Sequence, residues 1–192
     1  MSFNTMATFF ALAALAANVA TVALVVMGLT GRGRDRSPFE MLRGTILWLA
    51  GSVALAAMLG SLYLSEIAHL VPCRFCWFQR IAMYPLALIL LMAAYRKDGM
   101  ARLYAATLAV IGAGIAIYHR FLQAFPSLDS GSCAAVGPAC TAALIEKFGF
   151  VTIPYMSMSG FLLILALLWA DRVNAKTTTS EAVTTVGTEP ST

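Results

Sequence analysis

The sequence predicts an all-α integral membrane protein with five spanning helices. Hydrophobic residues make up 60% of the 192 residues and charged residues only 11%, and the mean hydropathy is +0.80. Soluble domains carry roughly 25% charged residues, so this composition excludes a water-soluble globule. Five apolar stretches have about the length of 20 residues that a helix needs to cross a bilayer. They lie at 6–29, 44–70, 77–95, 103–118 and 153–170.

The first stretch, 6–29, is predicted to be a retained helix and not a cleaved signal peptide. No Lys or Arg precedes Arg32, and the apolar run is longer than the hydrophobic region of a signal peptide. Residues 1–43 are therefore expected to form one transmembrane helix and a basic cytoplasmic loop. The end of the chain, 173–192, is rich in Thr and Ser without apolar periodicity, and is expected to be a disordered cytoplasmic tail.

The basic residues predict which way the helices cross the membrane. Nine of the 13 Lys and Arg fall on one side, and this side is expected to be cytoplasmic. The nine are Arg32, Arg34, Arg36, Arg43, Arg96, Lys97, Arg102, Arg172 and Lys176. The net charge of +4 is thus explained by orientation at the lipid surface, and a nucleic-acid partner is not predicted.

All four cysteines fall in the two segments that this orientation places outside. Cys73 and Cys76 occupy the turn before the third stretch, and Cys133 and Cys140 lie in the long external loop, 119–152. Thiols on that side of a membrane are not kept reduced, so two pairs suggest two disulfides. Proline and glycine interrupt the loop and favour a mobile segment, although a short surface helix around 144–151 is also compatible with its apolar spacing.

Structural disulfides, in a membrane scaffold or a transporter subunit, are the first alternative to redox chemistry. A Cys-x-x-Cys ring closes a very short loop and removes little entropy from the unfolded chain, so stability is a poor reason for the Cys73–Cys76 pair. A zinc or iron–sulfur site is the second alternative, because Cys-x-x-Cys is also a metal-ligand spacing. Metal sites usually repeat the close spacing, and Cys133 and Cys140 do not. No metal is predicted.

The surroundings of Cys76 favour redox chemistry. Cys76 is expected in the first turn of the third helix, where unpaired N–H groups and the helix dipole favour a thiolate. Arg80 follows one turn deeper on the same face, where its charge could stabilise that thiolate and polarise the carbonyl of an acceptor. The alternative role for Arg80 is to reach lipid phosphate at the membrane surface.

Three segments together resemble the DsbB/BdbC family of disulfide-bond formation proteins. The segment PCRFCWFQRIAMYP at 72–85 resembles the family signature, in which Cys-x-x-Cys is followed by Gln-Arg or Glu-Arg. YHRFLQ at 118–123 and FGFVTIP at 148–154 are similar to further family segments. The resemblance implies a four-helix transmembrane bundle of DsbB type over 44–172, with 6–29 as one additional N-terminal transmembrane helix.

The resemblance also implies a role for each cysteine. Cys133 matches the cysteine attacked by an extracytoplasmic thioredoxin-like thiol oxidase, and Cys140 its partner, which exchanges with Cys73. Cys76 matches the cysteine that faces a membrane quinone, either a ubiquinone or a menaquinone. Gln79, Arg80 and His119 are implied at the quinone site.

The implied activity is that of a membrane thiol:quinone oxidoreductase. Vitamin K epoxide reductase-like enzymes share this chemistry, but their loop cysteines precede the Cys-x-x-Cys pair, whereas here they follow it. Two features depart from the family pattern. One is the additional helix at 6–29, and the other is the close spacing of Cys133 and Cys140, which leaves less room for the two cysteines to act separately.

Overall fold

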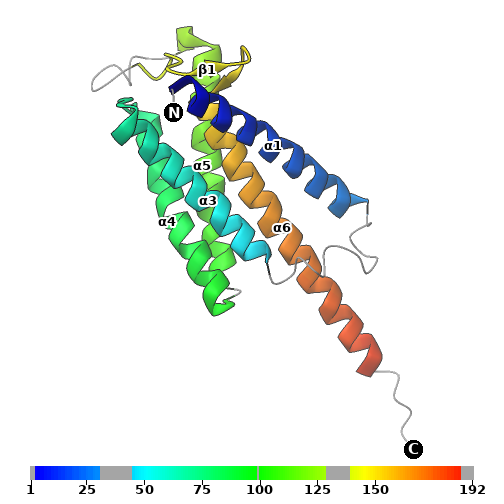
Figure 1. Ribbon diagram of the computed structural model, residues 1–192. Coiled ribbons are helices and arrows are strands. Elements are labelled where there is room, and N and C mark those ends of the chain that lie inside the picture. Colours follow the sequence, from blue (N-terminus) through cyan, green and yellow to red (C-terminus); the bar gives the residue numbers. More distant parts are fainter. Residues whose placement is uncertain (1–2, 31–44, 99, 129–138, 187–192) are drawn as a thin grey trace, which may run out of the picture.

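Five long helices make up most of the computed structural model, which describes residues 3–30, 45–98, 100–128 and 139–186 (Figure 1). Each helix is long and apolar enough to cross a membrane, as the sequence predicts, and the protein is a multi-pass membrane protein. The helices are α1 (Phe3–Leu29), α3 (Ile46–Leu62), α4 (Arg74–Arg96), α5 (Ala101–Ala124) and α6 (Ile153–Val186).

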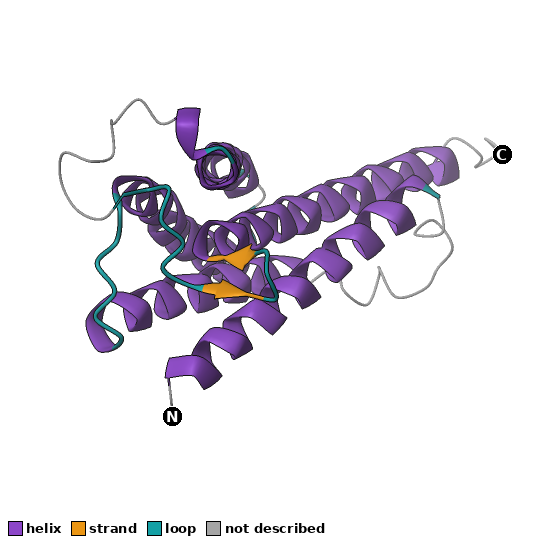
Figure 2. Ribbon diagram, turned by 90° about the horizontal axis from the view of Figure 1, so that it is seen from above, coloured by secondary structure: helices purple, strands orange, loops and turns teal. Residues whose placement is uncertain are grey.

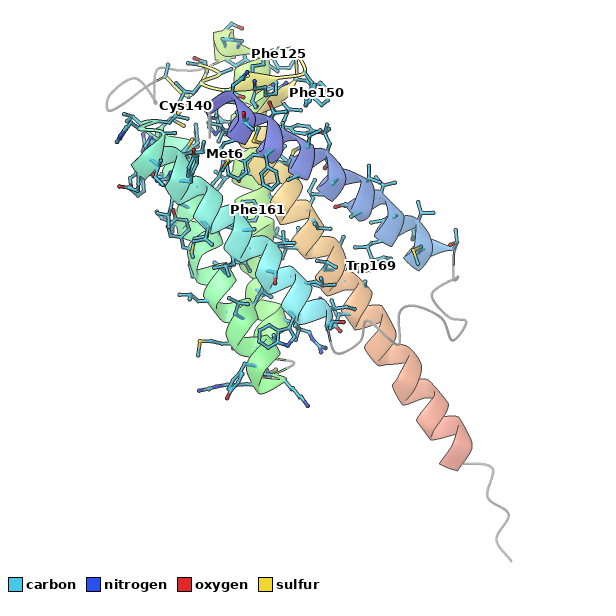
Figure 3. The ribbon with its side chains drawn as sticks, in the orientation of Figure 1. Met6, Phe125, Cys140, Phe150, Phe161 and Trp169 are labelled. Atoms are coloured by element: carbon cyan, nitrogen blue, oxygen red, sulfur yellow. The ribbon has the colours of Figure 1, made fainter. Side chains whose placement is uncertain are left out.

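Helices α3 to α6 form a closed four-helix bundle. Helix α3 packs on α4, α4 on α5, α5 on α6, and α6 back on α3. Small residues line the contacts, which lets the backbones approach closely where lipid provides no hydrophobic drive for association. The tightest example is Gly112 of α5, where a Cβ atom would lie 2.3 Å from the ring of Phe161 in α6. Phe161 is fully buried inside the bundle (Figure 3).

Helix α1 lies outside this bundle, alongside α6 (Figure 1). Midway along α1, the Asn18 amide donates hydrogen bonds to Tyr155 Oη, at 2.8 Å, and to Ser159 Oγ, at 3.0 Å. Near the end of α1, a Cβ on Gly28 would lie 2.3 Å from the ring of Trp169, so that the glycine admits the indole (Figure 3). Specific contacts therefore fix α1 against α6.

Two short strands cover the end of the bundle that carries the cysteines, called the cysteine end below. Strand β1 (Glu146–Lys147) pairs antiparallel with β2 (Val151–Thr152), and both lie across the helix ends (Figure 2). The surface helix compatible with the spacing at 144–151 is therefore wrong. Phe148 and Gly149 adopt positive φ angles of 55° and 76°, which turn the chain back on itself instead of continuing a helix.

Helix ends differ from the sequence prediction at two places. The second span changes from α3 into a π-helix, η1 (Tyr63–Ile67), just before the cysteines. Helix α6 continues through Val186, so the prediction of a disordered tail from 173 onward is wrong up to that residue. Extending a formed helix costs far less than nucleating one, so a long apolar span can carry a polar continuation. Residues 187–192 lie outside the described residues.

Candidate redox site

Cys73 and Cys76 stand where α4 begins. Cys73 is the N-cap residue, with an extended backbone (φ −71°, ψ 172°), and Cys76 lies in the first turn. Both are free thiols, and their sulfur atoms are 2.9 Å apart. A disulfide requires an S–S distance of about 2.05 Å, so a small movement would close the bond that the sequence predicts.

Cys73 belongs to a buried group of four residues, called the thiol cluster. Its other members are Gln79, His119 and Cys140, and the four side chains are 4%, 5%, 2% and 1% exposed in the order Cys73, Gln79, His119, Cys140. His119 Nε2 lies 3.6 Å from Cys73 Sγ and 3.1 Å from the carbonyl oxygen of Cys140. The α4 and α5 helices thus bring together residues that are 46 positions apart.

Gln79 sets the orientation of the His119 ring. Its amide Nε2 lies 3.1 Å from His119 Nδ1, and an amide nitrogen can only donate. Nδ1 therefore accepts, and the proton of the neutral ring resides on Nε2, the nitrogen that faces Cys73 and Cys140. Phe75 covers the other side of the ring, with centroids 5.5 Å apart.

Cys140 brings a disulfide next to the Cys73 thiol. Cys140 is disulfide-bonded, and its sulfur, Cys73 Sγ and a ring nitrogen of His119 all lie within 4.8 Å of one another. Cys133 lies outside the described residues. The same three side chains are spaced as ligands of a metal ion could be, but the sulfur of Cys140 is already bonded. The geometry suits thiol–disulfide exchange, in which a thiolate attacks a neighbouring disulfide sulfur.

The electrostatics of the cluster favour a thiolate on Cys73. The hydrogen bond from the Cys76 side chain lowers the pKa of Cys73 to about 4, with a further lowering from His119 and an opposing effect of burial. The sequence predicts the thiolate on Cys76, because that residue lies in the first helical turn. At the N-cap, Cys73 instead faces two donors, the Cys76 thiol and the His119 ring.

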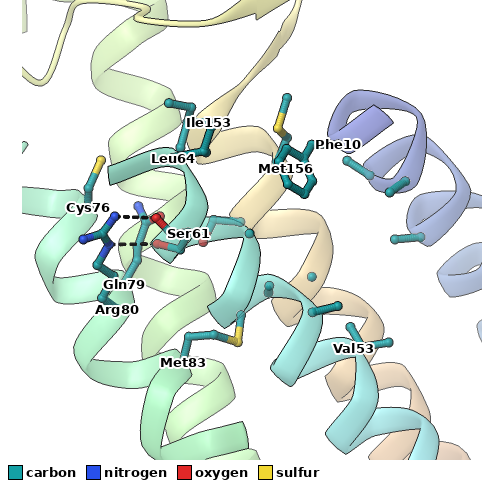
Figure 4. Close-up of a pocket in the computed structure, with 18 of the residues that line it drawn as sticks. Phe10, Val53, Ser61, Leu64, Cys76, Gln79, Arg80, Met83, Ile153 and Met156 are labelled. Atoms are coloured by element: carbon teal, nitrogen blue, oxygen red, sulfur yellow. Dashed lines mark hydrogen bonds between the residues drawn. The ribbon is translucent and has the colours of Figure 1, made fainter. Parts of the chain in front are cut away.

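A cavity of about 600 Å³ opens on the other side of Cys76 (Figure 4). Cys76, Gln79 and Arg80 of α4 line it together with Ser61 of α3, and these residues form its polar end. Most of the remaining lining is apolar and comes from α1, α3, α4 and α6. A large apolar pocket with a few convergent polar groups is the usual form of a small-molecule site.

Arg80 is held in place at the polar end. Its Nε donates to Ser61 Oγ and its Nη2 to the Ser61 carbonyl oxygen, both at 2.8 Å (Figure 4). Ser61 lies in the last turn of α3, directly before the chain passes into the π-helix η1, and its carbonyl oxygen also accepts from Ser65 Oγ at 3.4 Å. In the described part of the chain no carboxylate pairs with Arg80, so its positive charge is available to the cavity.

The predicted site residues thus divide into two groups. Cys76, Gln79 and Arg80 line the cavity, whereas His119 is not among its lining residues and lies with the thiols. The role implied for His119 at a quinone stays a prediction, and in this structure the α5 helix turns its ring toward Cys73. Gln79 belongs to both groups, since its amide binds His119 while the residue also lines the cavity.

Sequence reasoning missed three polar residues of the cavity, Ser61, Tyr84 and Ser157. Tyr84 lies two turns beyond Cys76 on the same face of α4, and that spacing could have identified it. Its hydroxyl is buried and has no hydrogen-bond partner among the described residues. Ser61 carries no comparable signal, because a serine in an apolar span more often bonds to its own helix.

Comparison with known proteins now decides the family. The family model described as "Disulfide bond formation protein DsbB" matches residues 43–171, about two thirds of the chain. The chain belongs to the DsbB family. Its role is accordingly in disulfide-bond formation, a thiol oxidoreductase function. The DsbB match begins at residue 43, so α1 lies outside the matched range.

Named relatives of the DsbB-family chain come from several bacteria. "Disulfide bond formation protein C" of Bacillus subtilis is 42% identical over 126 residues, which cover 66% of this chain and 91% of the relative. "Probable disulfide formation protein C 2" of Bacillus anthracis is 45% identical over 125 residues, covering 65% and 89%. "Probable disulfide formation protein" of Deinococcus radiodurans is 44% identical over 151 residues, covering 74% and 99%. No solved structure gives a significant match to the chain.

Proposed function

We propose that the protein is a membrane thiol:quinone oxidoreductase that reoxidises an extracytoplasmic thioredoxin-like disulfide oxidase. One observation carries the proposal: the two sulfurs of the Cys-x-x-Cys pair face different surroundings. Cys73 Sγ lies within 4.8 Å of the disulfide-bonded Cys140 sulfur, and Cys76, whose sulfur is 2.9 Å from that of Cys73, lines an apolar cavity. A path for two electrons from the loop to the cavity is therefore continuous.

The exchange steps need only the four cysteines and a donor with two thiols. The donor thiolate attacks the loop disulfide of Cys140, whose proposed partner is Cys133, and leaves oxidised while the loop pair becomes two thiols. The Cys140 thiolate then attacks the Cys73–Cys76 disulfide at the Cys73 sulfur. That attack gives a Cys140–Cys73 disulfide and frees the Cys76 thiolate. The second loop thiolate, proposed to be Cys133, then attacks the Cys140 sulfur, which re-forms the loop disulfide and leaves Cys73 and Cys76 reduced. Free Cys73 and Cys76 beside a bonded Cys140 correspond to the state after this second exchange.

The cavity residues fit a membrane quinone as the acceptor. A quinone bound there would accept two electrons and two protons and leave as a quinol. Cys76 and Cys73 supply the two electrons when they close their disulfide. The Cys76 thiol supplies one proton and, because Cys73 is a thiolate, the second proton comes from water. The Arg80 guanidinium, fixed by Ser61, presents a positive charge to a carbonyl oxygen that gains electron density. The apolar lining suits a lipid-soluble molecule entering from the bilayer.

The side of the membrane is part of this proposal. Most Lys and Arg of the connecting segments lie away from the cysteine end, which supports an extracytoplasmic position for the thiol cluster. A soluble DsbA-like partner would then meet the loop from outside, where disulfides are formed in secreted proteins.

The decisive experiment measures how fast the purified protein oxidises a reduced thioredoxin-like protein, with and without a membrane quinone. We expect a quinone-dependent rate that disappears in Cys76→Ser. Absence of any rate with several quinones and dithiol donors would overturn the proposal. If zinc or iron then copurifies with the protein in a stoichiometric amount, a metal site formed by Cys73 and His119 is the better account.

A further inference from the structure

Helix α1, which lies outside the range matched by the family, forms one wall of the cavity. Phe10, Ala13, Ala17 and Ala20 recur at helical spacing along one face of α1, and all four line the cavity. Figure 4 shows Phe10 on the side of the cavity opposite Cys76 and Arg80. The three alanines add little side-chain volume, so the space between α1 and the bundle stays open.

This wall extends the cavity along the membrane normal. From Phe10 to Ala20 the helix rises about 15 Å at 1.5 Å per residue. Across from it, the lining residues of α3 extend from Ser61 at the polar end to Val53, two turns deeper (Figure 4). Cys76, Gln79, Arg80 and Ser61 lie at one end of the cavity, and the rest of the lining is apolar apart from Tyr84 and Ser157. A molecule with a compact polar head and a long apolar chain fits this shape.

Specific contacts hold α1 at the position that encloses the cavity. An amide in the apolar layer is costly unless it is paired, and Asn18 donates to both Tyr155 and Ser159 of α6. The residue before it, Ala17, faces the cavity. At the polar end, a Cβ on Gly60 of α3 would lie 3.0 Å from the Phe10 ring, so these two helices also meet closely.

We propose that the α1 face of Phe10, Ala13, Ala17 and Ala20 binds the polyprenyl tail of the quinone acceptor. The inference rests on the proposed function, because it takes the quinone head to lie at Cys76 and Arg80. The tail is favoured over a phospholipid chain because the polar end contains a redox-active thiol on the electron path. Helix α1 thereby makes the site selective for acceptors that carry a tail.

The test adds bulk to the wall and compares two acceptors. Ala17→Phe places a ring in the cavity, whereas Val19→Phe adds a ring at a position that is 71% exposed and outside the lining. We expect Ala17→Phe to raise the KM for an isoprenoid quinone by about tenfold or more, while the KM for a quinone without a tail stays within about twofold. Val19→Phe should change neither KM.

A second readout does not depend on turnover. A quinone analogue with a diazirine in its tail is photolysed with the protein, and the labelled residues are identified by mass spectrometry. We expect labelling within the α1 segment that lines the cavity, reduced in Ala17→Phe and unchanged in Val19→Phe. Equal KM changes for both acceptors, or tail labelling confined to other helices, would overturn the inference. A wild-type protein that turns over neither acceptor would instead overturn the proposed function.

Discussion

The thiol cluster and the cavity differ in almost every physical property, although a single turn of α4 separates them. The cluster is small, closed and polar, with Cys73, His119 and Cys140 nearly without exposure. The cavity is large, mostly apolar and supplied with a fixed guanidinium. Cys73 belongs to the first and Cys76 to the second, so a three-residue spacing is enough to give two sulfurs different surroundings.

Under the proposed function, this difference would assign a separate role to each sulfur of the pair. A sulfur that must exchange with another disulfide benefits from a low pKa and a nearby bonded sulfur, which Cys73 has. A sulfur that must pass electrons to a lipid-soluble acceptor needs an apolar approach, which Cys76 has. The predictions below test whether the two roles separate.

The largest effect is expected from serine substitutions in the pair. Both Cys76→Ser and Cys73→Ser should lower quinone-dependent oxidation by about 10³-fold or more, because each removes a sulfur that cannot be replaced. The products should differ: Cys76→Ser should accumulate a disulfide between Cys73 and a loop cysteine, and Cys73→Ser should not. Non-reducing electrophoresis and mass spectrometry distinguish them. Identical products from the two variants would contradict the assignment of loop exchange to Cys73 alone.

A smaller effect, confined to the cavity, is expected from Arg80→Gln. Loss of the guanidinium removes two hydrogen bonds to Ser61 and the positive charge of the cavity, so the KM for quinone should rise by roughly tenfold to a hundredfold. Thiol exchange with the protein donor should keep its rate in single-turnover measurements. Arg74→Gln is the matched control, since Arg74 is exposed and does not line the cavity. A slowed exchange step in Arg80→Gln would contradict the separation.

His119→Ala should act on the cluster alone, by raising the pKa of Cys73. Because the folded-state pKa is depressed from about 9 to about 4, the thiolate stabilises the fold fully above pH 9, and this contribution is lost as the pH falls from 9 toward 4. Removing the imidazole should raise the pKa of Cys73 by about one unit. Thiolate absorbance, followed as a function of pH with Cys73 and Cys76 reduced, measures this pKa. The exposed His69, changed to Asn, serves as the control. An unchanged pKa of Cys73 in His119→Ala would show that His119 does not stabilise this thiolate.

The smallest change in function is expected from Gly112→Ala. This change should weaken the packing of α5 on α6, which supports the thiol cluster and the cavity alike. A Cβ at Gly112 would collide with the buried Phe161 ring, and such overpacking costs about 1–3 kcal/mol. Gly114→Ala meets nothing within 4 Å and should be neutral or slightly stabilising. Thermal unfolding in detergent compares the two. A selective loss of either half-reaction in Gly112→Ala would indicate that α5–α6 packing supports one region specifically.

The sequence predicts the five helices well because long apolar stretches leave few alternatives in a bilayer. It does not predict the hairpin at 146–152, since its reversal depends on positive φ angles at Phe148 and Gly149 that no apolar pattern encodes. The helical continuation to Val186 was also missed, because polar composition alone does not show that a preceding helix can be extended.

Within the site, the cysteines and Arg80 were predicted from residue type and spacing, and the structure adds the surroundings of Cys73, Cys76, Cys140 and Arg80. The role of His119 required the fold, because the face of α5 that turns toward Cys73 depends on helix packing. The wall formed by α1 was also inaccessible to sequence reasoning. A helix that is apolar all round gives no periodic signal for the face that meets protein instead of lipid, and Asn18 alone hints at a contact.

The burial of the thiol cluster also limits which reductants can reach its sulfur atoms. Dissolved small thiols such as glutathione need direct access to a sulfur, and Cys73 and Cys140 offer 4% and 1% of their surface. Aromatic rings pack in the same region, where Phe75 lies edge-to-face with Tyr118 and tilted against His119. A macromolecular donor that engages the loop gains binding energy to rearrange this cover, whereas a colliding small molecule does not. The Cys73 and Cys140 sulfurs are thereby shielded sterically from small thiols.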